Sequence, residues 1–135
     1  MTTGIITILV TAVTFLIMLL GFALRRNRRV HIALMSLVIV YDVLFPFYLF
    51  FSRDWYKRLV VNEDILTFGV WMHFGGVILL YVLYVFQIQA ARNMMTDAAD
   101  VESRVNHRKQ GIGLLITRGY VLLTGAMLYD PQYAL

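Results

Sequence analysis

The first part of the chain is a long uncharged apolar run that ends in a cluster of arginines. The run from Thr3 to Leu24 includes no Asp, Glu, Lys, Arg or His. A helix of about 20 residues crosses the hydrocarbon core of a bilayer, so this run is long enough to span a membrane. It is too long for a signal-peptide core, no basic residue precedes it, and its arginines follow it. The run therefore predicts a membrane-spanning helix that is retained in the protein.

Three further apolar runs follow the first one. Of the 135 residues, 60% are hydrophobic and 15% are charged, which is more apolar surface than a soluble domain of this size can bury. The lipid bilayer is therefore the first expected partner. The four runs predict a single transmembrane domain over residues 1–135, an all-α integral membrane four-helix bundle with helices at about 3–24, 30–51, 65–91 and 111–129.

Lysine and arginine are unevenly distributed over the three connections, and this predicts the orientation of the bundle. The first and third connections share one side of an up-down bundle and hold eight basic residues, Arg25, Arg26, Arg28, Arg29, Arg92, Arg104, Arg108 and Lys109. The second connection holds three, Arg53, Lys57 and Arg58. Since cytoplasmic loops carry the excess positive charge, both termini are expected on the outer side of a prokaryotic cytoplasmic (inner) membrane. The net charge of +4 then suits anionic lipid headgroups, and no nucleic-acid partner is expected.

Three ionisable side chains fall inside the predicted membrane helices, where a charge costs about 2.5–3.5 kcal/mol on insertion scales. Asp42 follows His31 at the same spacing at which Arg118 follows His107. This spacing is about three helical turns, so each pair shares a helix face, about 16 Å apart along the axis. Counting from the outer helix ends puts His73 at the same depth, which predicts one intramembrane polar layer of Asp42, His73 and Arg118. Asp42 and Arg118 are expected to touch, with His73 close by.

This layer has two interpretations. In the structural one, Asp42 and Arg118 neutralise each other and hold two helices together, while His73 donates to a carbonyl group. In the functional one, the three side chains line a binding site or a proton path, in which His73 beside a carboxylate relays protons because histidine titrates near neutral pH.

The histidines are also candidate cofactor ligands, because imidazole binds haem iron and copper in membrane proteins. His31 and His107 begin two parallel helices at one depth near the cytoplasmic face, as a bis-histidine haem b or a copper ion requires. His73 is a further candidate cofactor ligand, although no second histidine shares its depth. The alternative for His107 is an interfacial histidine near lipid headgroups. The chain has no cysteine, which excludes disulfides and thiolate ligands.

Several short motifs resemble those of one known family. They are HIALM at 31–35, WMHFGG at 71–76, NHRKQG at 106–111 and LLTGAMLY at 122–129. Together they resemble the DUF420 family of small four-helix membrane proteins, over most of the chain from residue 28 to residue 129. Members usually have an aromatic residue where this chain has Arg118 and a small or apolar residue where it has Asp42. The two charges therefore indicate a compensating pair.

The resemblance also implies a function, because DUF420 proteins have been linked to the biogenesis of haem–copper terminal oxidases. It implies a small respiratory-chain protein that supports this biogenesis and binds haem or copper through histidines. One alternative is a structural or redox accessory subunit of a larger respiratory or photosynthetic complex, whose other subunits would be its partners. A second alternative is a small proton-conducting protein. The sequence has no hydrolytic or nucleophilic constellation, so the protein is predicted not to be an enzyme.

Overall fold

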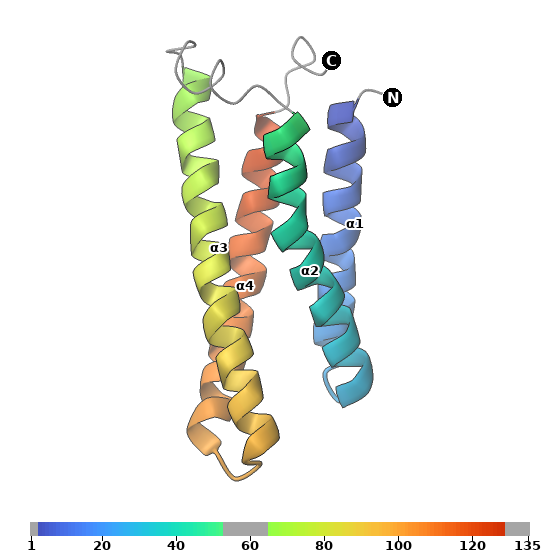
Figure 1. Ribbon diagram of the computed structural model, residues 1–135, viewed down its shortest axis with the longest axis vertical. Helices are drawn as coiled ribbons and strands as arrows, with labels where there is room; N and C mark the ends of the chain where they lie inside the picture. The colour runs from blue at the N-terminus through green and yellow to red at the C-terminus, as the bar shows by residue number, and fades with distance from the viewer. Residues whose placement is uncertain (1–2, 53–64, 129–135) are drawn as a thin grey trace.

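The protein is described by a computed structural model over residues 3–52 and 65–128, and these residues form four helices running up and down (Figure 1). The helices are α1 (Thr3–Ala23), α2 (Arg28–Ser52), α3 (Ile65–Thr96) and α4 (Val101–Met127). The predicted all-α, four-helix architecture is confirmed. The turns after α1 and after α3 lie at one end of the molecule, hereafter the turn end (Figure 1). The second connection, with Arg53, Lys57 and Arg58, lies outside the described residues.

Three of the four helices are long and apolar enough to cross a membrane. These spans are Gly4–Ala23, Arg28–Ser52 and Phe68–Thr96. Many of their large apolar side chains are exposed, which suits contact with lipid acyl chains. α4 differs from the sequence prediction because it is not one of the candidate spans. Its first turns carry several charged side chains, and Arg118 further lowers its hydropathy.

The third connection is shorter than predicted, because both flanking helices extend into it. α3 continues to Thr96, whose hydroxyl donates to the carbonyl oxygens of Arg92 and Asn93 at 3.2 and 3.0 Å. Thr96 is therefore the last residue of α3. Asp100 is the N-cap of α4, since its carboxylate accepts from the backbone N–H and the hydroxyl of Ser103 at 2.9 and 2.6 Å. This cap starts α4 well before the predicted position.

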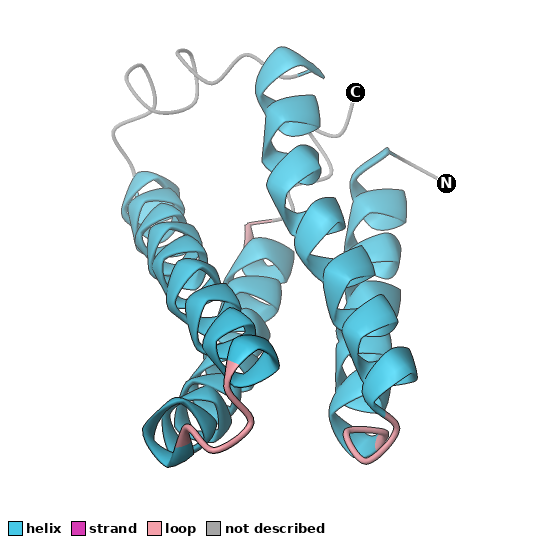
Figure 2. Ribbon diagram, turned by 60° about the horizontal axis from the view of Figure 1, so that its bottom comes forward, coloured by secondary structure: helices cyan, strands magenta, loops and turns pink. Residues whose placement is uncertain are grey.

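The helices pack as two hairpins, α1 with α2 and α3 with α4. A methyl group added at Gly21 would lie 3.2 Å from Cβ of Leu34, and one added at Gly76 would lie 2.9 Å from Cε1 of Tyr120. Glycine thus allows close approach inside each hairpin. Between the hairpins, α1 packs on α4, whereas α2 meets α3 and α4 mainly through side chains. Figures 1 and 2 both show the two turns standing apart at the turn end.

All four helices contribute to one small buried cluster. It consists of Met18 from α1, Val38 from α2, Leu80 and Tyr84 from α3, and Leu114 from α4. This cluster lies beside the polar side chains described next, because Tyr84 belongs to both. The apolar core therefore adjoins the polar contacts.

Candidate functional site: an ion pair and a histidine pair

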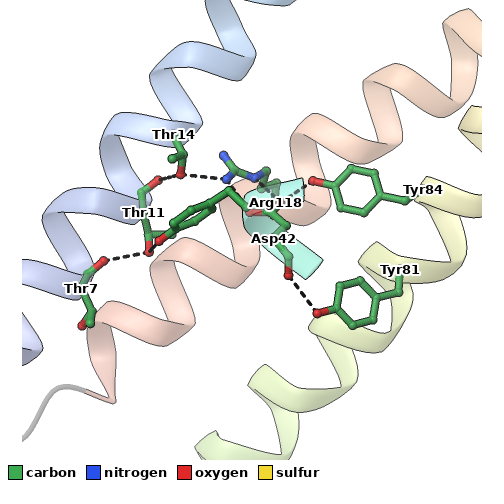
Figure 3. Close-up of polar contacts among 8 residues, drawn as sticks. Thr7, Thr11, Thr14, Asp42, Tyr81, Tyr84 and Arg118 are labelled. Atoms are coloured by element: carbon green, nitrogen blue, oxygen red, sulfur yellow. Dashed lines mark hydrogen bonds and ion pairs between the residues drawn. The ribbon is translucent and has the colours of Figure 1, made fainter. Parts of the chain in front are cut away.

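An ion pair between Asp42 of α2 and Arg118 of α4 lies at the centre of the bundle (Figure 3). Nε of Arg118 donates to Oδ2 of Asp42 at 2.8 Å, and Nη2 donates to Oδ1 at 2.7 Å. Arg118 is 2% exposed and Asp42 is 9% exposed. The predicted contact between these two residues is confirmed. Its two-pronged geometry is the strong form of an arginine–carboxylate pair.

The other two helices add hydrogen bonds to this pair (Figure 3). From α3, the hydroxyl of Tyr84 donates to Oδ2 of Asp42, and the hydroxyl of Tyr81 donates to the Asp42 backbone carbonyl at 2.9 Å. From α1, Oγ1 of Thr14 accepts from Nη2 of Arg118 at 2.9 Å. We call these five residues the central junction. One guanidinium and one carboxylate thus connect all four helices, although Nη1 of Arg118 is buried without a partner.

The central junction does not include His73, contrary to the sequence prediction. Nδ1 of His73 lies 3.0 Å from Oγ1 of Thr124, and its ring packs against Gly125. Thr124 is nearly two helical turns beyond Arg118, about 9 Å along the α4 axis. Counting from helix ends failed because α3 extends beyond α2 at the end away from the turns (Figure 1). The tyrosines two and three turns farther along α3 occupy the layer instead.

His31 and His107 meet near the turn end, as predicted from their positions at the expected starts of the second and fourth helices. Their ring centroids are 6.2 Å apart, with an angle of 78° between the ring planes. Nδ1 of His31 lies 2.8 Å from the carbonyl oxygen of Gly21, at the end of α1. A carbonyl oxygen only accepts, so Nδ1 of His31 is the nitrogen that carries the hydrogen. In the neutral ring, the lone pair of His31 is then on Nε2.

One glutamine contacts His107, and a second follows it on the same helix. The amide nitrogen of Gln87, from α3, lies 3.4 Å from Nε2 of His107. Gln110 follows His107 by about one helical turn on α4 and therefore stands on the same side of that helix. Three atoms of this group are buried without a hydrogen-bond partner: Nδ1 of His107, Oε1 of Gln87 and Oε1 of Gln110. We call His31, Gln87, His107 and Gln110 the histidine cluster.

A polar pocket of about 340 Å³ opens beside the histidine cluster, between α3 and α4. Its lining includes Asn93, Ser103, Asn106 and Gln110, so Gln110 belongs both to the cluster and to the pocket wall. Among residues 3–52 and 65–128, no group of three or more His, Cys, Asp or Glu side chains is placed to hold a metal ion. A metal ion held by His31 and His107 would therefore have no third His, Cys, Asp or Glu ligand from these residues.

The sequence interpretation missed the residues that complete both clusters. Tyr81, Tyr84 and Gln87 recur at every third position on α3, which places them on one helix face in an otherwise apolar segment. That spacing was the available signal. Gln110, one turn after His107, was a second one. Thr14 gave no signal, because a hydroxyl in a membrane helix usually bonds its own backbone, and Thr14 also donates to the carbonyl of Thr11 at 2.9 Å.

Comparison of the chain with protein-family models, curated proteins and solved structures finds no match. The function is therefore inferred from the central junction and the histidine cluster.

Proposed function

We propose that the chain is a protein of the prokaryotic cytoplasmic membrane that binds haem iron or copper between His31 and His107 and serves the respiratory chain. The observation that carries this proposal is the pair of imidazole rings with centroids 6.2 Å apart, contributed by two different helices. Three helices long and apolar enough to span a membrane support the location. When bound, either metal supplies one-electron chemistry, and the protein supplies its binding and orientation.

The respiratory role is supported by the motifs around His31, His73 and His107 that resemble the DUF420 family. In this role the protein holds its metal for a haem–copper terminal oxidase during biogenesis. It acts by binding and not by catalysing a reaction of its own. The partners of such a protein are subunits of the oxidase or of another electron-transfer complex in the same membrane.

The orientation in the membrane follows from the basic residues at the turn end. Arg25, Arg26, Arg28 and Arg29 adjoin the first turn, so the turn end faces the cytoplasm and both termini face outward. The chain has no cysteine, which makes single-cysteine labelling clean. A cysteine at Ser52 should react with an impermeant thiol reagent added to intact cells, whereas one at Asp97 should react only in opened cells. The reverse pattern contradicts this orientation.

Metal analysis and a reduced-minus-oxidised optical spectrum of the purified protein test the metal site. We expect haem b or copper in the native preparation, and loss of that metal in both His31→Ala and His107→Ala. His73→Ala is the matched control, because its ring is also partly buried but lies against Thr124 and away from the other two histidines. Metal that persists in both His31→Ala and His107→Ala contradicts the proposed function.

A further inference from the structure

The nitrogen atoms that the histidine cluster leaves free are not the ones that a haem site needs. We propose that it binds a single copper ion, in the cuprous state, through Nε2 of His31 and Nδ1 of His107, with Gln87 as the residue that positions His107. This inference rests on the proposed function above and chooses between its two metals.

His31 is already held in the way that metal-binding histidines are held. Its Nδ1–H donates to the Gly21 carbonyl oxygen at 2.8 Å, which fixes the ring and leaves the lone pair on Nε2. Histidine ligands of metals almost always donate their second ring N–H to a carbonyl, a carboxylate or water. The contact comes from α1, a different helix from the one that carries His31. The orientation of the ring is therefore set by the tertiary structure.

Gln87 can hold His107 in the same way. The Gln87 amide nitrogen lies 3.4 Å from Nε2 of His107, and the Gln87 amide oxygen is buried without a partner. A half-turn of the amide exchanges these two atoms, since they are nearly the same size, and brings the oxygen against Nε2–H. His107 then has its lone pair on Nδ1, the atom that is buried without a partner. Each histidine thus has one nitrogen held by an amide oxygen and one nitrogen free.

A porphyrin does not fit this pair of free atoms. Nδ1 is next to the ring carbon that bears Cβ, so a porphyrin plane bound there would collide with the side chain's own Cβ and with α4. The nitrogen of His107 that lies farther from Cβ, Nε2, faces Gln87. A bare ion has no such requirement. With metal–nitrogen bonds of about 2 Å, two imidazoles that share one ion have centroids about 5–6.5 Å apart, and the observed separation is 6.2 Å.

Copper suits the donors better than zinc does. Structural zinc takes four ligands, usually including thiolates, whereas this site offers two neutral imidazoles, and no third His, Cys, Asp or Glu joins them among the described residues. Met35 carries a soft thioether and follows His31 by one helical turn, and its methyl group lies 3.4 Å from the position of a Cβ on Gly21. Both side chains therefore converge on Gly21. Thioether sulfur selects cuprous copper, and imidazole accepts it.

The test is a set of titrations of the purified full-length protein in detergent micelles. Cuprous ion is titrated against a chromogenic chelator, and zinc ion and haemin are titrated separately. We expect one cuprous ion per chain and no low-spin haem spectrum. His31→Ala and His107→Ala should each abolish binding, and His73→Ala should leave it unchanged. Gln87→Leu should weaken binding by about 10–100-fold, the usual effect of losing an orienting partner.

Two further measurements separate positioning by Gln87 from a merely structural effect. Gln87→Glu should restore affinity, because a carboxylate also accepts from Nε2–H. In the 15N spectrum of the imidazoles, cuprous ion should shift Nε2 of His31 and Nδ1 of His107. In Gln87→Leu, the His107 shift should be divided between its two nitrogens. Equal affinity of the leucine variant and the native protein overturns the role of Gln87.

The outcomes also distinguish this inference from the proposed function. A haem whose low-spin spectrum disappears in His31→Ala and in His107→Ala, with no cuprous binding, overturns the copper assignment and leaves the proposed function intact. Tight zinc binding that depends on both histidines, without preference for copper, overturns the choice of ion. Failure of all three titrations contradicts both proposals. Far-ultraviolet circular dichroism and monodisperse gel filtration identify any variant that has not folded.

Discussion

The central junction and the histidine cluster both connect α2, α3 and α4, yet they differ in how completely their polar atoms are paired. In the junction, both carboxylate oxygens of Asp42 accept hydrogen bonds, and only Nη1 of Arg118 is unpaired. In the cluster, three buried polar atoms lack partners. An unpaired buried group costs about 1–3 kcal/mol, so the empty cluster carries a larger cost from unpaired polar atoms than the junction does. This difference indicates that the junction holds the fold and the cluster awaits a ligand.

The strongest test of this comparison is a double-mutant cycle on the ion pair. Asp42→Asn or Arg118→Leu alone should each lower the free energy of unfolding by about 3–5 kcal/mol, because each leaves a buried charge without its partner. The double variant should recover much of that loss. The measurement is reversible unfolding in detergent micelles, followed by circular dichroism.

A matched cycle serves as the control for this coupling. Arg108 is an exposed arginine on the same helix, so Arg108→Leu combined with Asp42→Asn should give additive effects. Additive losses in the Asp42–Arg118 cycle as well would mean that the two charges are not energetically coupled. The junction would then not be what holds α2 to α4.

Replacement of a residue of the histidine cluster should raise the free energy of unfolding, whereas replacement of Asp42 or Arg118 lowers it. Gln110→Leu removes a buried oxygen that has no partner and keeps a similar side-chain volume, so the metal-free protein should become more stable by about 1 kcal/mol. The same unfolding assay measures this change. Gln89→Leu is the control: Gln89 is an exposed residue of the same pocket, and its replacement should change stability little. A clear loss of stability in Gln110→Leu would show that its oxygen is already satisfied in the protein.

The sequence predicted which residues meet on the parallel helices α2 and α4 better than it predicted the level of a residue on the antiparallel helix α3. The equal spacings from His31 to Asp42 and from His107 to Arg118 correctly indicated two meeting levels, because α2 and α4 begin at the same end. His73 was misplaced because α3 runs the other way. Its register against α4 depends on close packing at glycines such as Gly76, which contacts Tyr120, and residue counts do not encode that packing.

The polar partners were harder to predict than the charges. A charge in an apolar helix stands out, whereas Tyr84 and Gln87 are compatible with many positions in a membrane helix. The start of α4 was misjudged for a different reason. Charged residues such as Glu102 and Arg104 suggested a loop, but the Asp100 cap and the packing of α4 on α3 extend the helix through them. Tertiary packing overrode a local pattern there.

The smallest predicted effect concerns Asp100, which caps α4 at the same end of the molecule as the histidine cluster. The hydroxyl and backbone N–H of Ser103 donate to the carboxylate and hold the pKa of Asp100 below its ordinary value. A lowered pKa means that the cap stabilises α4 fully above the ordinary value of about 4 and is lost as the pH falls through the lower folded-state value. Loss of the cap on acidification should therefore loosen the first turns of α4, including His107, more than the distant turn that carries Arg118. Amide hydrogen exchange at Ser103 to His107, compared with Arg118, measures this difference.

Asp100→Asn is the matched control, because asparagine caps a helix about as well and does not titrate. Equal pH dependence of hydrogen exchange in the native protein and in Asp100→Asn would mean that another group, and not the Asp100 cap, causes the loosening.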